Sequence, residues 1–293
     1  MGTSVLATAR GPGYARNEAV CNSRGDYLCH LDADDYMHSR RVELQLELAI
    51  EKGVNCLIGC NFCRAPANST PYYQDWLNSL SDEELVIQQY RECTIICPSW
   101  FMHRYVFYKI AKLRSLCGNR AFVESYEDKT LQRIPEDTFF FMDHLQLGGT
   151  LSKVPKCLLT YRYTNGSWAL GTRKQDLQKV RLVFLEKNIL SFWDSFMIYG
   201  FGKDAKKIYN MLSIDMKYKV SAFCDVDQKK IGRLHFCRVT QRHRKVLDYK
   251  QVRPPFIVCV ASKRYIGSSV HDSVEDNIAS LGFTASIDYF QFC

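Results

Sequence analysis

Three carboxylates stand close together after an apolar stretch, in the segment YLCHLDADDYM (27–37). Asp32 and Asp34 follow residues that predict a buried strand, and they have the spacing at which strand side chains share one face. Hard oxygen ligands that converge suit Mg²⁺ or Mn²⁺, and such ions usually complete their shell with substrate phosphates. The pattern predicts a divalent-ion site that neutralises a departing nucleoside diphosphate. The alternative is a polar strand end that caps the next helix.

A second pair of acids, Glu136 and Asp137, opens the segment EDTFFFMDHLQLGG, which predicts a helix closed by two glycines. A carboxylate at a helix start that faces the same cleft is able to accept a proton from an acceptor hydroxyl. Helix capping is the alternative, because the macrodipole favours acids in the first turn.

Thirteen cysteines are scattered along the 293 residues, without the regular short spacing of a disulfide framework. They predict reduced, partly buried thiols. Cys60 and Cys63 have the spacing of half a zinc site, but Cys93 and Cys97 have one residue too many between them. Buried structural thiols are therefore favoured over zinc.

A glycine-rich turn follows the apolar residues FMIY, at Gly200-Phe201-Gly202. It resembles the opening of a dinucleotide fingerprint, with Ala205 at the third glycine position and Asp225 where an acid would bind ribose. The alternative is a structural Rossmann-like unit without a nucleotide. Further on, the basic segment RVTQRHRKVLDYKQVR (238–253) is able to lie against a phosphate backbone, or to form a solvated loop.

The composition is that of a globular protein with a sizeable hydrophobic core. Hydrophobic residues make up 46% of the chain, enough for a sizeable core, and the net charge of +8 permits a polyanionic partner without requiring one. No apolar run approaches the length of a membrane helix, and the start is too weakly apolar for a signal peptide. We therefore expect no membrane span and a cytoplasmic location.

The remaining patterns predict alternating strands and helices, hence an α/β chain with two domains, 1–190 and 191–293. Ser39 is expected to cap the helix that Gly53 ends, and Ser81 with Glu84 has the spacing of a capping box. The expected strands and helices are 11–25, 26–31, 39–53, 54–62, 81–93, 134–149, 154–164, 173–190, 196–212, 218–227 and 254–261.

Taken together, the first 190 residues resemble family 2 glycosyltransferases of the GT-A type. The resemblance rests on GYARNEAV, GDYLCHLDADD, PEDTFFFMDHL and YRY, in that family's order and roughly its spacing. In the tail, CDVDQKKI, RPPFIVCV and EDNIASLGF resemble one narrow group, the beta-1,3-N-acetylglucosaminyltransferase-like proteins, which are similar to queuosine-tRNA galactosyltransferase. The fold implied is a GT-A domain followed by a small Rossmann-like domain.

The resemblance implies a role for several residues. Arg16 and Asn17 would border the nucleotide, Asp32 would hold the ribose side of a UDP-sugar, and Asp34 would bind Mn²⁺ or Mg²⁺. Asp137 would be the general base of an inverting, single-displacement transfer.

On the acceptor side, the resemblance implies Trp100, whose ring would stack on a sugar or base, together with Glu136. The reaction implied is transfer of galactose from UDP-galactose to queuosine in tRNA-Tyr. The alternatives are transfer of N-acetylglucosamine from UDP-GlcNAc to a glycan, and an inactive form that only binds RNA or a partner protein.

The sequence departs from the family pattern in two ways. Family members normally carry about two βα units before GYARN, so we expect an N-terminally truncated GT-A domain with weak or no activity. They also often place a metal-binding histidine just after YRY, where this chain has Thr164 followed by Asn165. A hydroxyl or amide oxygen is the poorer ligand, which predicts a lower metal affinity.

Overall fold

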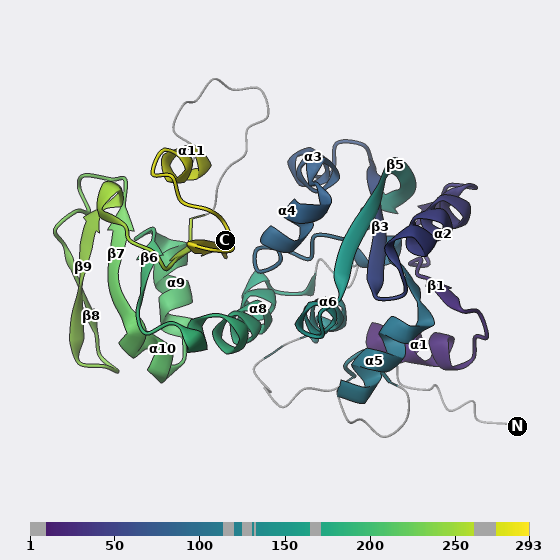
Figure 1. Ribbon diagram of the computed structural model, residues 1–293, viewed down its shortest axis with the longest axis horizontal. Helices are drawn as coiled ribbons and strands as arrows, with labels where there is room; N and C mark the ends of the chain where they lie inside the picture. The colour runs from purple at the N-terminus through teal and green to yellow at the C-terminus, as the bar shows by residue number, and fades with distance from the viewer. Residues whose placement is uncertain are drawn as a thin grey trace, which may run out of the picture. The chain divides into compact units, whose positions relative to one another are not determined.

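The computed structural model describes residues 10–113, 120–124, 131, 133–164, 171–260 and 274–292. The chain divides into two compact units, the first of residues 1–69 and 95–177 and the second of residues 70–94 and 178–293. The division after residue 177 lies near the boundary expected at 190, but segment 70–94 belongs with the second unit. Each unit has its own sheet with helices, so the α/β class is confirmed (Figure 1).

The first unit is built on a five-stranded mixed sheet with the strand order β1-β4-β3-β5-β2. The neighbouring strands β3 and β5 run parallel. The other three pairs, β1 with β4, β4 with β3 and β5 with β2, are antiparallel. The strands are β1 (Tyr27–Cys29), β2 (Tyr36–Met37), β3 (Cys56–Ala65), β4 (Phe101–His103) and β5 (Thr150–Arg162). The helices are α1 (Gly11–Cys21), α2 (Arg41–Lys52), α5 (Arg104–Leu113) and α6 (Glu136–Gln146).

Two helices cover the sheet from opposite sides, because α2 and α6 lie on either side of β3 and β5 (Figure 1). On the α2 side, Ala49 packs with Ile58 and Phe101. The α6 side carries an aromatic cluster in which the rings of Phe122 and Phe140 stack at 4.6 Å. Burial of these large apolar surfaces is what holds the first unit together.

Arg41, the first residue of α2, lies fully buried under the segment that follows β1. Its guanidinium donates to the His30 carbonyl and to Gln45 Oε1, both at 2.8 Å. The Gln45 amide in turn donates to the Ser99 carbonyl at 2.9 Å. A buried cation with these partners fixes the chain between β1 and the acidic motif.

The local signals for helix ends are partly confirmed. The capping box of Ser81 and Glu84 is present, and Gly53 ends α2 at a φ of +87°. The Ser39 cap is wrong, because α2 begins one residue later, with Arg40 at its N-cap and no side-chain cap. Tertiary contacts of Arg41 set that start instead of local capping.

Within the part of the chain that the structure describes, Cys63 of β3 and Cys157 of β5 form a disulfide. The prediction of reduced thiols is therefore wrong for this pair, whose two residues are 94 positions apart in sequence. Pairing of β3 with β5 brings the two residues together, and no short spacing signals it.

The second unit is built on a six-stranded sheet with the order β11-β10-β6-β7-β9-β8, parallel except for β8 against β9. Its strands are β6 (Phe196–Tyr199), β7 (Val220–Asp225), β8 (Leu234–Cys237), β9 (Arg242–Asp248), β10 (Phe256–Val258) and β11 (Tyr289–Gln291). Its helices are α3 (Pro71–Ser79), α4 (Asp82–Ile87), α9 (Lys203–Met211), α10 (Ile214–Lys219), α11 (Val274–Ala279) and most of α8 (Lys174–Asn188). None of the described helices is long and apolar enough to cross a membrane.

The β8–β9 hairpin corrects the expectation of a solvated loop for much of segment 238–253. Arg244 on β9 is only 5% exposed, and its guanidinium donates to the carbonyls of Val220 and Lys217. The cation is buried because those carbonyls would otherwise lack a partner. On the hairpin's outer face, the rings of Phe236 and His243 stand 4.9 Å apart.

We predict that Arg41→Leu lowers the free energy of unfolding by about 3 kcal/mol, because it leaves buried carbonyl and amide groups without their partner. Urea denaturation measures this change. The matched control is Arg40→Leu, since Arg40 is exposed and its one ion pair among the described residues is with Glu43 on the surface. The control should change stability by no more than about 0.5 kcal/mol. Equal losses in both variants would contradict the structural role of Arg41.

Candidate active site

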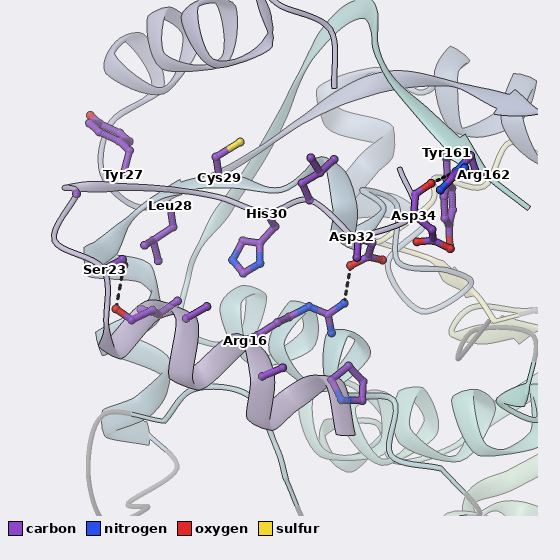
Figure 2. A pocket seen from close by; sticks show the side chains of 17 residues that line it. Arg16, Ser23, Tyr27, Leu28, Cys29, His30, Asp32, Asp34, Tyr161 and Arg162 are labelled. Carbon is purple, nitrogen blue, oxygen red and sulfur yellow. Dashed lines mark hydrogen bonds and ion pairs between the residues drawn. The ribbon is translucent and has the colours of Figure 1, made fainter. Parts of the chain in front are cut away.

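The first unit contains a cavity of about 660 Å³ between α1 and the chain that follows β1 (Figure 2). A volume of this size is within the usual range for small-molecule sites. Polar or charged groups that line it come from α1, from the segment between α1 and β1, from the segment after β1 and from the end of β5: Arg16, Ser23, His30, Asp32, Asp34, Tyr161 and Arg162. The cavity therefore contains the acidic motif and two arginines.

Asp32 and Asp34 lie in a turn, not in a strand. The strand β1 ends at Cys29, and the Asp35 amide donates to the Asp32 carbonyl at 3.1 Å. The argument from strand alternation is therefore wrong, although both side chains do line the same cavity. They have different partners, because Asp32 Oδ1 accepts from Arg16 at 3.0 Å and Asp34 Oδ2 accepts from Thr164 Oγ1 at 2.8 Å.

Arg16 stands between two acids that are distant in sequence. It points from α1 toward the Asp32 carboxylate (Figure 2), and its other terminal nitrogen donates to Glu136 Oε1. The Arg16 side chain is only 17% exposed, so water screens these pairs weakly. The result is a rigid guanidinium with one edge on the cavity.

Arg162, at the end of β5, holds the acidic turn from the other side. Its Nε donates to the Asp34 carbonyl, and its backbone amide donates to Asp35 Oδ1 at 2.8 Å. Arg162 is the central residue of the YRY motif, for which no role was expected. The sequence signal for its role is an arginine at the end of an expected strand, where it is able to pair with acidic residues of another segment.

Asp35 is the buried member of the acidic cluster, at 7% exposure, and its Oδ2 has no hydrogen-bond partner among the described residues. Burial raises its pKa to about 6, with further contributions from Asp32 and Asp34, whereas the hydrogen bond from the Arg162 amide opposes the shift. Asp35 therefore shapes the turn and does not line the cavity.

His30 lines the cavity as a neutral imidazole. Burial lowers its pKa to about 3, and the nearby Arg16 and Arg41 act in the same direction. Its ring packs edge-on against Phe122 at 5.6 Å. His30 therefore contributes a neutral polar group to the cavity lining, and the positive charge there comes from arginines such as Arg16.

Glu136 and Asp137 open α6 as expected, but neither lines the cavity. Glu136 is 4% exposed, and burial raises its pKa to about 7. The negative charge of Asp137 acts in the same direction on the Glu136 pKa, whereas the positive charge of Arg16 opposes the shift. Asp137 Oδ1 accepts from the amide of Thr138 at 2.6 Å. The role of Asp137 as general base stays a prediction.

Two residues expected near ligands are buried in the fold. The Asn17 side-chain amide pairs with the backbone of Phe122 and with Glu124, at 2.8 to 2.9 Å, and it does not line the cavity described above. Trp100 is 0% exposed, and its indole N–H donates to the Ile95 carbonyl at 2.8 Å. In this structure Trp100 is a core residue, so its ring has no free face on which an acceptor could stack.

The residues present fit a divalent ion only as a partial shell. Asp34 and Thr164 place a carboxylate and a hydroxyl oxygen 2.8 Å apart, both hard ligands of the kind that Mg²⁺ accepts. Asn165 lies outside the described residues. Among those that are described, no three histidine, cysteine, aspartate or glutamate side chains gather as a metal site. The arrangement matches an ion that takes one or two protein carboxylates and completes its shell with ligand phosphates.

Comparison with known proteins identifies one family pattern. The sequence model described as Glycosyl transferase family 2 matches residues 5–111, which include α1, β1 and the acidic turn. This segment therefore carries the family 2 glycosyltransferase pattern, and the mixed α/β architecture agrees with the GT-A type that the sequence predicts.

Among solved structures, the crystal structure of S. aureus TarS 1–349 is similar, with a TM-score of 0.39 and 14% sequence identity. The similarity covers 73% of this chain and 59% of the TarS chain, so the chain spans less than two thirds of that structure. A likeness of this degree does not bear on activity.

The raised pKa of Asp35 predicts a pH dependence of stability. Because the folded pKa of about 6 lies above the reference value of 3.8, the contribution of Asp35 to stability is greatest below about pH 4 and is lost as the pH rises through about 6. Asp35→Asn should remove this loss, so the gap in melting temperature between variant and parent should shift in the variant's favour from pH 4 to pH 7.5. Asp26→Asn, on an exposed residue, is the control. A gap that does not change with pH would contradict the assignment.

Proposed function

We propose that the chain is a UDP-sugar-dependent glycosyltransferase that moves galactose from UDP-galactose to queuosine in tRNA-Tyr. The observation that carries the proposal is that the family 2 pattern of residues 5–111 coincides with a cavity lined by Asp32, Asp34 and Arg16. The choice of galactose and queuosine comes from the resemblance of the tail segments to one narrow group.

The cavity has the polarity that a nucleotide-diphosphate sugar requires. Asp32 accepts hydrogen bonds from ribose hydroxyls while Arg16 holds its carboxylate in place. Arg162 supports the Asp34 backbone, so the Asp34 carboxylate stays directed at the cavity beside Thr164. A divalent ion bound there would supply charge neutralisation for the leaving diphosphate.

A base must take the proton of the attacking hydroxyl, and Asp137 is the residue proposed for it. Its neighbour Glu136 is occupied by Arg16, which leaves Asp137 as the acid at the start of α6 that is not paired with this arginine. General-base catalysis of this kind contributes about 10²–10⁴-fold to the rate.

A tRNA acceptor is supported by charge and by one surface of the second unit. The net charge is +8, and the outer face of the β8–β9 hairpin combines exposed Leu234 and Phe236 with His243 and Lys245. Aromatic and basic side chains on one face suit stacking on bases next to a phosphate backbone.

Two alternatives remain within the proposal. One keeps the chemistry and replaces the pair of substrates by UDP-GlcNAc and a glycan. The other is an inactive form that only binds RNA or a partner protein. Salt-dependent binding of tRNA without any sugar transfer favours the inactive form, whereas transfer to a glycan and not to tRNA favours the first alternative.

The test is incubation of the protein with queuosine-containing tRNA-Tyr, UDP-galactose and Mn²⁺, followed by mass spectrometry of the released nucleosides. We predict slow formation of a queuosine that carries one additional hexose, in keeping with the weak activity expected of this chain. Asp34→Asn should reduce the product about a hundredfold or more, because it removes the carboxylate proposed to hold the ion. A chelator added to the parent protein should have the same effect.

Asp26→Asn makes the same charge change on an exposed residue outside the cavity and should leave the product unchanged. Absence of any hexose gain, with tRNA binding intact, would remove the proposed reaction. Equal activity of the Asp34→Asn variant would remove the proposed metal role.

A further inference from the structure

The second unit has a cavity of its own, of about 350 Å³, at the carboxyl ends of β6, β7 and β10. The strand β6 lies between β10 and β7, and the chain leaves it first toward β7 and only later returns to β10 on the other side. The strand order therefore reverses at this point. In open parallel sheets, ligands bind in the crevice at such a reversal.

The loop from Gly200 to Gly202 crosses this crevice in a fixed conformation. Gly200 has a φ of +109°, and a Cβ atom there would stand 2.6 Å from the Val260 side chain and 3.0 Å from the Cys259 carbonyl. Only glycine satisfies both conditions. Asp225 Oδ2 accepts from the Phe201 amide at 2.7 Å, which holds the loop from the end of β7.

The helix α9 begins at this loop, and its first two residues, Lys203 and Asp204, line the cavity. Its N-cap is Gly202, and no side chain caps the first turn. A Cβ atom on Gly202 would meet nothing within 4 Å, and Gly202 lines the cavity. The uncapped first-turn amides and the helix macrodipole together favour an anion at this position.

An independent observation points to a ligand in the same cavity. Tyr199, the last residue of β6, lines the cavity and is 1% exposed, and its hydroxyl has no hydrogen-bond partner among the described residues. A buried hydroxyl without a partner is costly, so a ligand atom that pairs with it would bind favourably. Burial raises the pKa of Tyr199, so the phenol keeps its proton and is available as a donor.

Two lysines line the second-unit cavity, and one of them, Lys203, is available to pair with an anionic ligand. Lys230 is paired with Asp225 at 3.1 Å and lies 3.7 Å from Asp227. Lys203 stands in the first turn of α9 and forms no ion pair within the part of the chain that the structure describes. Asp204, which also lines the cavity, disfavours a ligand with many negative charges and offers an acceptor for hydroxyl groups.

We propose that the second-unit cavity binds a nucleoside monophosphate or a ligand that contains one, with its phosphate on the first turn of α9 at Gly202 and Lys203. The Tyr199 hydroxyl donates to the nucleoside part, and Asp204 accepts from its ribose hydroxyls. This site is separate from the proposed donor site, because the lining residues of the two cavities belong to different units.

The test is calorimetric titration of the full chain with AMP, UMP and inorganic phosphate. At least one nucleotide should bind saturably and more tightly than phosphate. Gly202→Val should weaken that binding at least about tenfold, because the added side chain fills the phosphate position. The fold should survive, since Gly202 has a φ of −80° and a ψ of −170°, which any residue adopts, and unchanged circular dichroism would confirm this.

Two further variants separate ligand contact from structural effects. Lys203→Ala should weaken binding about three- to tenfold, whereas Lys207→Ala, the same change on α9 outside the cavity lining, should not. Tyr199→Phe should weaken binding about fivefold without lowering the melting temperature, because it removes an unpaired hydroxyl.

Absence of saturable nucleotide binding up to about 5 mM overturns the proposal. So does nucleotide binding that Gly202→Val leaves unchanged, since that binding would belong to the first-unit cavity. Equal affinity for inorganic phosphate and for both nucleotides overturns the nucleoside part. None of these outcomes depends on sugar transfer, so failure here is distinguishable from failure of the proposed glycosyltransferase.

Discussion

The interaction on which the first unit depends is the guanidinium of Arg16 between Asp32 and Glu136. It joins α1, the acidic turn and α6, and the two paired acids are separated by more than a hundred residues of chain. A charge that is 17% exposed is tolerable only when opposite charges satisfy it, so each of the three elements constrains the other two. Arg16 and Asp32 both line the cavity, so this contact fixes the position of that part of the cavity wall.

The same constraint changes what the acidic cluster is able to do. Asp32 faces Arg16, Asp34 faces Thr164, and Asp35 holds the amide of Arg162, so much of the local negative charge already has a partner. Carboxylates that already have partners attract a divalent ion less strongly than free carboxylates would. The expectation of lowered metal affinity, based on Thr164 and Asn165 in place of a histidine, stays a prediction.

The two units use related chemistry in different ways. In the first, side chains from distant segments meet around a cavity and determine its polarity. In the second unit, a backbone loop and the start of α9 determine the polarity of the cavity. The Asp225 carboxylate holds this loop by accepting a hydrogen bond from the Phe201 amide. Backbone amides at a helix start suit phosphate groups in general, whereas a cavity lined by specific side chains is more selective.

The sequence by itself determined the α/β class, the glycine turn between β6 and α9, the capping box at Ser81, and the acids that open α6. Each of these depends on hydrogen bonds or periodicity within a few neighbouring residues, which a single chain segment displays. Only the tertiary structure decided that Trp100 and Asn17 are buried, that Arg162 supports the acidic turn, and that Cys63 meets Cys157. Those outcomes depend on which distant segments pack together, and the identity of a residue does not reveal whether its polar atoms will face a ligand or a buried carbonyl.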